Sequence, residues 1–129
     1  MIGKAAAVVP HPGGAPLRLL CFDHPLAGPQ IVKGTIRPEE PPLHAARREL
    51  WEEAGLTARS GLLLGQSADI VAGEIWHFAL LRVAAPVPDR WGHLCQDDGG
   101  HIFQCRWQDV GAAAAFTGRF ARAWTWIGQ

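Results

Sequence analysis

The chain has 129 residues, 48% of them hydrophobic and 19% charged, which excludes a disordered or fibrous protein and leaves a globular domain with a real core. Twelve basic and twelve acidic residues give a formal charge of zero, so the whole chain shows no nucleic-acid footprint and no membrane attraction. No stretch approaches a membrane span, and three cysteines, an odd count without a secretory context, predict reduced thiols in a cytoplasm. We expect one domain over residues 1–129, cytoplasmic, as a monomer or a homodimer.

The first third of the chain reads as short strands. Residues 5–9 and 17–22 are apolar runs separated by the turn residues 11–14, which predicts a β-hairpin. Residues 23–29 contain two prolines and one glycine and are expected to form a loop. Residues 30–32 then predict a short strand.

A helix of about three turns is predicted from Pro42 to the residue before Gly55. Pro41 and Pro42 fix an extended entry, and proline is tolerated at the first helical position. Gly55 suits the left-handed residue just past a helix C-terminus. At about 100° per residue, one apolar stripe is formed by Leu43, Ala46, Leu50 and Ala54.

The neighbouring arc of this helix is acidic. Glu49 precedes Glu52 by three residues and Glu53 by four, so the three carboxylates crowd one side and repel one another. Arg48 stands four residues before Glu52 and is expected to pair with it. Two interpretations stay open: a solvated acidic face, or a site for a hard divalent cation, which prefers oxygen ligands.

The rest of the chain adds strands and a closing helix. Residues 58–66 and 74–83 predict strands, and the second is rich in β-branched and aromatic residues, as central strands are. Residues 93–95 and 102–107 flank a turn and predict a hairpin. Residues 110–127 predict an amphipathic helix. This order predicts an α+β fold, an α/β/α sandwich with a mixed β-sheet between helices.

The segment from Gly34 to Leu56 resembles the Nudix box, G-x5-E-x7-R-E-U-x-E-E-x-G-U with U aliphatic. The fixed positions are all filled, by Gly34, Glu40, Arg48, Glu49, Leu50, Glu52, Glu53, Gly55 and Leu56. The resemblance is tight over the box and holds only in outline elsewhere. It implies a Nudix hydrolase, with a mixed sheet between helices and the box forming a loop, a helix and a loop.

The resemblance also implies a reaction, in which water attacks phosphorus and cleaves a nucleoside diphosphate linked to another moiety, with Mg²⁺ or Mn²⁺ as cofactor. The substrate would be a small nucleotide or nucleotide derivative. Glu49, Glu52 and Glu53 resemble the family's metal ligands, and Glu40 resembles the outer glutamate near the metals. We assign Glu52, Glu53 and Arg48 to catalysis, with Arg48 orienting a box glutamate and one carboxylate serving as general base.

Four residues are candidates for substrate binding. Lys33 and Gly34 open the box where a Gly-Gly pair is common, and Lys33 either reaches a substrate phosphate or is a solvated loop lysine. Asp97 and Asp98, like Glu74, are candidates for an additional acid from another loop. The two aspartates are equally well explained as turn residues.

Two alternatives stay open. The predicted hairpin carries residue types that bind zinc, although their spacings do not match the usual paired knuckles. These residues are His93, Cys95, His101 and Cys105. The chain is either the hydrolase or a non-catalytic Nudix-fold module that binds nucleotides or regulates, and the presence of all three helix glutamates favours the enzyme.

Overall fold

The structure is a computed structural model of the chain and describes residues 1–96, 99–111 and 116–129. Its elements, in chain order, are β1 (Ile2–Val8), β2 (Arg18–His24), β3 (Gly28–Gln30), β4 (Lys33–Thr35), α1 (Pro42–Ala54), β5 (Ser60–Ser67), β6 (Glu74–Arg82), β7 (Arg90–Cys95), β8 (His101–Asp109) and α2 (Gly118–Ile127).

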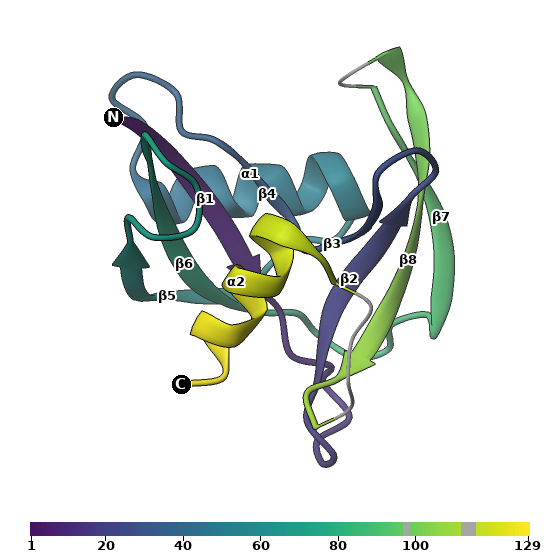
Figure 1. Cartoon of the computed structure of the whole chain (residues 1–129). Coiled ribbons are helices and arrows are strands. Elements are labelled where there is room, and N and C mark those ends of the chain that lie inside the picture. Colours follow the sequence, from purple (N-terminus) through teal and green to yellow (C-terminus); the bar gives the residue numbers. More distant parts are fainter. Residues whose placement is uncertain (97–98, 112–115) are drawn as a thin grey trace.

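The described strands form two four-stranded sheets, which lie to the left and right in Figure 1, with α2 crossing in front. The first sheet has the order β4-β1-β6-β5 and is mixed, because β1 and β6 run parallel while its other pairs are antiparallel. The second sheet, β3-β2-β8-β7, is antiparallel throughout. The predicted α+β class with a mixed sheet is confirmed, and the strands are divided between two sheets.

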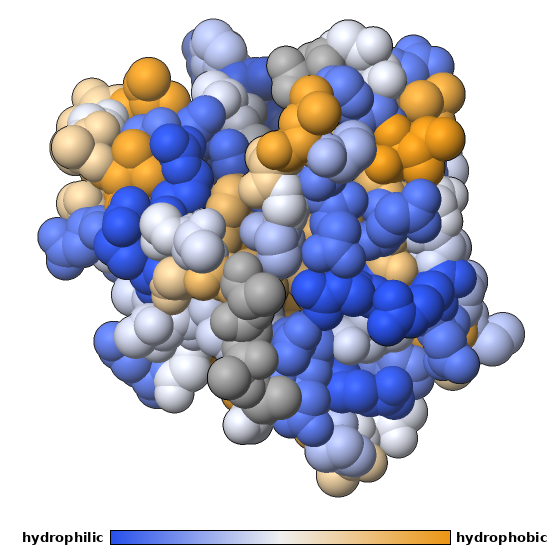
Figure 2. All heavy atoms as spheres, turned by 45° about the vertical axis from the view of Figure 1, so that its right-hand side comes forward, coloured by the Kyte–Doolittle hydropathy of each residue, from blue (hydrophilic) through white to orange (hydrophobic). Residues whose placement is uncertain are grey.

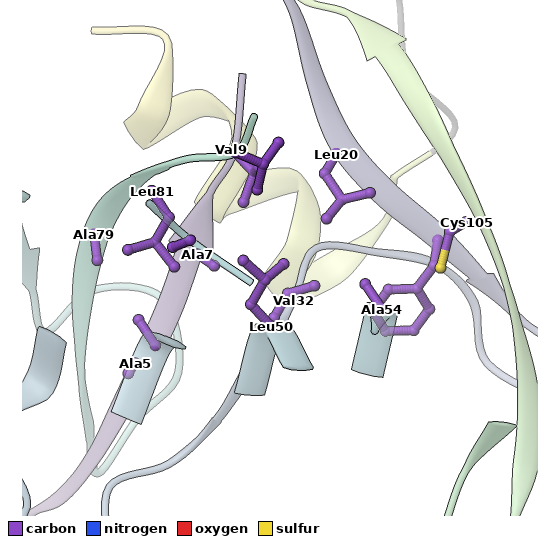
Figure 3. Close-up of a cluster of buried hydrophobic side chains, with 14 of the residues drawn as sticks. Ala5, Ala7, Val9, Leu20, Val32, Leu50, Ala54, Ala79, Leu81 and Cys105 are labelled. Carbon is purple, nitrogen blue, oxygen red and sulfur yellow. The ribbon is translucent and has the colours of Figure 1, made fainter. Parts of the chain in front are cut away.

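Successive side chains of β1 point to two cores on opposite sides of its sheet, as the period of a strand requires. Ala5 and Ala7 face the core that contains α1, whereas Ala6 and Val8 face the core that contains α2. Figure 3 shows the first core, where Leu50 of α1 lies among side chains from β1, β2 and β6. One face of α1 therefore packs against both sheets.

Helix α1 has the predicted limits. Pro41 at its N-terminus is extended (φ −63°, ψ 143°), and Gly55 is left-handed (φ 71°) and donates its backbone N–H to the carbonyl of Trp51. The buried side chains of α1 are apolar with the exception of Glu49. Burial of the predicted stripe thus fixes which way the acidic arc of the helix points.

The predicted first hairpin is wrong. β1 and β2 belong to different sheets, and an isolated bridge pairs Pro10, which follows β1, with Leu19 of β2. The loop predicted over residues 23–29 instead contains a hairpin, because β2 continues to His24, which pairs with Gly28 of β3. The strand predicted at 30–32 is displaced, since β3 ends and β4 begins on either side of residues 31–32.

The closing helix is shorter than predicted. Instead of 110–127 it spans Gly118–Ile127, since β8 stays paired with β2 as far as Asp109 and residues 110 and 111 form a turn after it. Phe116 precedes the helix, and residues 112–115 lie outside the described part of the chain. The predicted hairpin of β7 and β8 is confirmed, as are the strands β5 and β6.

Strand β5 lies at an edge of the first sheet. Three consecutive side chains, Leu62, Leu63 and Leu64, are 61%, 46% and 44% exposed, and the segment SGLLLGQS carries no charge.

On the face shown in Figure 2, hydrophobic residues gather in separate patches with a hydrophilic band between them. Among the described residues no helix is both long and apolar enough to cross a membrane.

Candidate functional site

Arg48 joins three carboxylates at the start of the site. Its Nε and Nη2 donate to the two carboxylate oxygens of Glu40 at 2.8 and 2.9 Å. Its Nη1 donates to Glu49 at 2.6 Å and to Glu52 at 3.2 Å. Nη2 also donates to the carbonyl of Thr35 at 3.0 Å. The guanidinium therefore fixes the loop before α1 to the acidic arc of the helix, and the expected Arg48–Glu52 pair is present.

Glu40 has further contacts besides Arg48. Its Oε1 accepts the backbone N–H of Arg37 at 3.0 Å, and its Oε2 lies 2.8 Å from Nδ1 of His44. Hydrogen bonding to Arg48 is the main cause that holds the pKa of the Glu40 carboxyl well below its usual range, against the opposing effect of burial. Both oxygens of Glu40 are thus engaged, and the structure places this residue behind Arg48.

Gly34 and Glu49 are in close contact. A Cβ added at Gly34 would overlap the carboxyl group of Glu49, so glycine leaves room for the carboxylate in this position. Glu49 is only 6% exposed, so its carboxylate is held in a largely buried position. A buried carboxylate against an open backbone suits a cation that takes oxygen ligands from both side chain and main chain.

Glu53 and Lys33 are also brought together. Oε1 of Glu53 accepts the backbone N–H of Lys33 at 3.0 Å, which ties the end of α1 to β4. The Lys33 ammonium lies 5.9 Å from the ring centroid of Trp76, within the range of a cation–π contact. Burial and then the charge of Lys4 lower the pKa of Lys33.

Two cavities, of about 400 and about 340 Å³, adjoin each other, and Glu53 lines the larger one. They share three lining residues, Ala27, Gln30 and Lys33, and so form one groove that runs from α1 to the start of α2. Its other lining residues are His24, Leu26, Glu53, Cys95, Phe103, Thr117, Gly118, Arg119 and Phe120. A larger cavity of about 650 Å³ lies between α2 and the β5–β6 connection, and no glutamate of the box lines it.

The helix carboxylates fit a divalent cation by their chemistry. Glu49 and Glu52 already converge on one nitrogen of Arg48, and Glu53 follows on the same helix. In the described part of the chain, no three His, Cys, Asp or Glu side chains are grouped closely enough to hold a metal ion as they stand. A cation at Glu49 and Glu52 therefore requires their carboxylates to turn from Nη1 of Arg48.

The remaining candidates lie apart from this cluster. Asp97 and Asp98 fall outside the described residues, and Glu74 accepts a hydrogen bond from the indole of Trp76 at 2.8 Å. Of the possible zinc ligands, Cys95 pairs in register with His101, whereas His93 pairs with Phe103 and Cys105 with Trp91, so the four are spread along the hairpin. Cys95 and Cys105 are both buried, and burial raises the pKa of the Cys105 thiol to about 12.

Three residues near the site were not predicted. His44 lies four residues after Glu40, a helical spacing that could have indicated the contact. Arg37 lies in the loop before α1, and its Nη2 is 3.7 Å from Oε1 of Glu52. His24, at the end of β2, lines the groove. No sequence signal indicated these two, because both depend on how a loop folds back.

Comparison with known proteins agrees with this fold. A family model described as NUDIX domain matches residues 3–126. The chain is similar in structure to the NUDIX domain of Shewanella oneidensis NrtR complexed with ADP ribose (TM-score 0.70, 12% identity, 99% of this chain and 86% of that chain covered). It is also similar to a MutT NUDIX hydrolase from Burkholderia pseudomallei (TM-score 0.63, 21% identity, 96% of this chain and 95% of that chain covered). A third similar structure is a NUDIX hydrolase from Nitrosomonas europaea (TM-score 0.61, 20% identity, 84% of this chain and 72% of that chain covered). No curated protein sequence matches the chain.

Proposed function

The chain belongs to the Nudix family, and from this membership we propose that it is a divalent-metal-dependent pyrophosphohydrolase of a nucleotide derivative. As a Nudix protein it is a hydrolase of phosphoric anhydride bonds. The observation that carries this proposal is the acidic arc of α1: Glu49 and Glu52 converge on Arg48, Glu49 also lies against Gly34, and Glu53 lines the groove.

In this proposal Glu49, Glu52 and Glu53 hold Mg²⁺ or Mn²⁺, and the carbonyl next to Gly34 supplies a further oxygen. The ion, when bound, lowers the pKa of a water and neutralises phosphate charge. Arg48 holds Glu49 and Glu52 together through Nη1 before the ion binds, and Glu40 keeps Arg48 in place.

The reaction itself needs a water, a base and a held phosphate. The water oxygen forms a bond to phosphorus while the bond from phosphorus to the bridging oxygen breaks, and the leaving phosphate takes that oxygen. Glu53 is the proposed acceptor of the water's proton, because it is the one box glutamate that lines the groove. Lys33, at the centre of the groove, is proposed to bind a substrate phosphate, and Lys33→Ala is expected to raise KM.

The test is release of phosphate or pyrophosphate from a panel of nucleoside triphosphates, nucleoside diphosphate sugars and dinucleoside polyphosphates, with Mg²⁺ or Mn²⁺. We expect turnover of one class, reduced by about 10²-fold or more in Glu53→Gln. Glu39→Gln is the matched control, because Glu39 is an exposed acid of the same loop and helix region. A wild-type chain that turns over nothing, or a fully active Glu53→Gln, would remove the proposal.

A second candidate is a non-catalytic module that binds nucleotides. It is favoured by the engagement of Glu40, Glu49 and Glu52 with Arg48, and by the structural similarity to a NUDIX domain complexed with ADP ribose. Calorimetry with ADP-ribose separates the two: tight binding without turnover supports the module.

A further inference from the structure

His24 has an unusual position at the turn between β2 and β3. Its Nδ1 accepts the backbone N–H groups of Leu26 at 3.0 Å and Ala27 at 3.1 Å. An imidazole nitrogen that accepts hydrogen bonds carries no proton, so the proton of this tautomer is on Nε2. The three-residue turn, closed by Gly28 in the left-handed region (φ 79°), thus fixes both the tautomer and the position of the ring.

The opposite nitrogen is available to a ligand. Within the described part of the chain, Nε2 of His24 makes no hydrogen bond, and the residue lines the same cavity as Glu53 and Lys33. The His24 ring rests against Phe103, with centroids 5.2 Å apart, and against His101, with centroids 4.9 Å apart. The ring is therefore held in place and presents an N–H donor beside the groove.

The lining of the groove indicates which kind of ligand group would accept a hydrogen bond from His24. Its polar lining residues include Gln30, Lys33 and Arg119, which supply N–H donors or positive charge. Among the residues that the structure describes, Glu53 is the one carboxylate that lines it. A surface that offers donors and positive charge matches an acceptor-rich, negatively charged group. Phosphate oxygens have this chemistry.

We infer that His24 is a substrate-binding residue that donates its Nε2–H to a phosphate oxygen of the substrate, on the side of the groove opposite α2. The inference rests on the proposed function for the identity of the substrate. It assigns to the β2–β3 turn the task of orienting the phosphates beside Glu53.

Two substitutions distinguish the roles of the two imidazole nitrogens. His24→Asn keeps an oxygen near the position of Nδ1, which can accept from Leu26 and Ala27, but has nothing at the position of Nε2. His24→Gln places an amide N–H near Nε2 and loses the acceptor of the turn. His11→Asn is the matched control, since Nδ1 of His11 also accepts a backbone N–H, from Gly13 at 2.9 Å, and does not line the groove.

The measurements are KM and kcat for the best nucleotide of the panel, and calorimetry with α,β-methylene ADP and with adenosine. We expect His24→Asn to raise KM and the Kd for α,β-methylene ADP by about tenfold, with kcat and the Kd for adenosine unchanged. His24→Gln is expected to recover part of this affinity, and His11→Asn to behave as wild type.

An unchanged Kd for α,β-methylene ADP in His24→Asn overturns the inference, as does a wild-type chain that does not bind this analogue. An equal loss for adenosine overturns the assignment to phosphate. A third outcome separates the inference from the proposed function. If the wild type binds the analogue, His24→Asn binds it more weakly, and no nucleotide of the panel is turned over, then the proposed function fails while the inference stands.

Discussion

Arg48 makes two different kinds of contact with the carboxylates around it. Glu40 receives two parallel bonds from the guanidinium, whereas Glu49 and Glu52 share the single nitrogen Nη1. Parallel pairs are the stronger arrangement. We therefore expect Arg48 to stay with Glu40 when Glu49 and Glu52 turn to a cation.

Glu40→Gln is predicted to lower the free energy of unfolding by about 2 kcal/mol near neutral pH, because it removes the charge from a nearly buried pair. In the folded state the pKa of Glu40 is depressed below its ordinary value of 4.5. The stabilisation is therefore fully present above pH 4.5 and is lost as the pH falls toward the folded pKa. Urea unfolding on both sides of this value measures it, with Glu39→Gln as control. A difference that does not shrink in acid contradicts the prediction.

Gly34→Ala is predicted to reduce activity by about 10- to 100-fold, because the new Cβ displaces the Glu49 carboxylate. Steady-state kinetics and Mn²⁺ titration measure the effect. Gly128→Ala is the control, since a Cβ at Gly128 meets only backbone oxygens at 3.6 and 3.7 Å. Full activity and unchanged Mn²⁺ affinity in Gly34→Ala would show that Glu49 is not needed where the structure holds it.

Some side-chain contacts of the site could be predicted from the sequence, and others could not. The Arg48–Glu52 pair follows from helical spacing alone, and the structure has it. The Arg48–Glu40 pair and the contact of Glu49 with Gly34 depend on the path of the loop before α1, which local spacing does not determine.

At the scale of elements, the end of α1 is fixed by a strand of the second sheet. The indole Nε1 of Trp91, on β7, donates to the carbonyl of Ala54 at 2.8 Å. Such a bond satisfies one of the carbonyls left open at a helix C-terminus. It also sets the position of Glu53, one residue before Ala54.

Trp91→Phe keeps the packing and removes this bond, and we predict a loss of about 1 kcal/mol in the free energy of unfolding together with a lower kcat. Denaturant unfolding and kinetics measure the two effects. Trp107→Phe is the control, because its indole donates to Pro88, away from α1. Equal kinetics in both variants would argue that the bond contributes only to stability.

The elements that were predicted correctly are marked at their ends by residues within the same stretch of sequence. Pro41 and Gly55 mark both ends of α1, and turn residues mark the β7–β8 hairpin. The pairing of β1 with β6 is parallel and joins residues far apart in the chain, so the turn at 11–14 wrongly indicated that β1 pairs with β2. The predicted start of α2 at residue 110 was wrong, since residues 110 and 111 form a turn after β8 and the helix begins at Gly118.

At the scale of the molecule, α1 is the element that both sheets share. A cation bound to α1 therefore stabilises the whole fold. We predict that Mn²⁺ at about 100 times its Kd raises the free energy of unfolding by about 2.7 kcal/mol in one cooperative transition, and that a chelator reverses this. Thermal unfolding with and without Mn²⁺ measures it, and Glu49→Gln should abolish the gain. The same gain in that variant would indicate binding elsewhere.

Strand β5 has a consequence for handling the protein. An uncharged edge strand with three exposed leucines offers open backbone groups to any other strand, and a chain with zero formal charge has little electrostatic repulsion to keep copies apart. Colloidal stability near neutral pH will then depend on concentration more than on folding. A stock that loses material on storage does so from molecules that are still native.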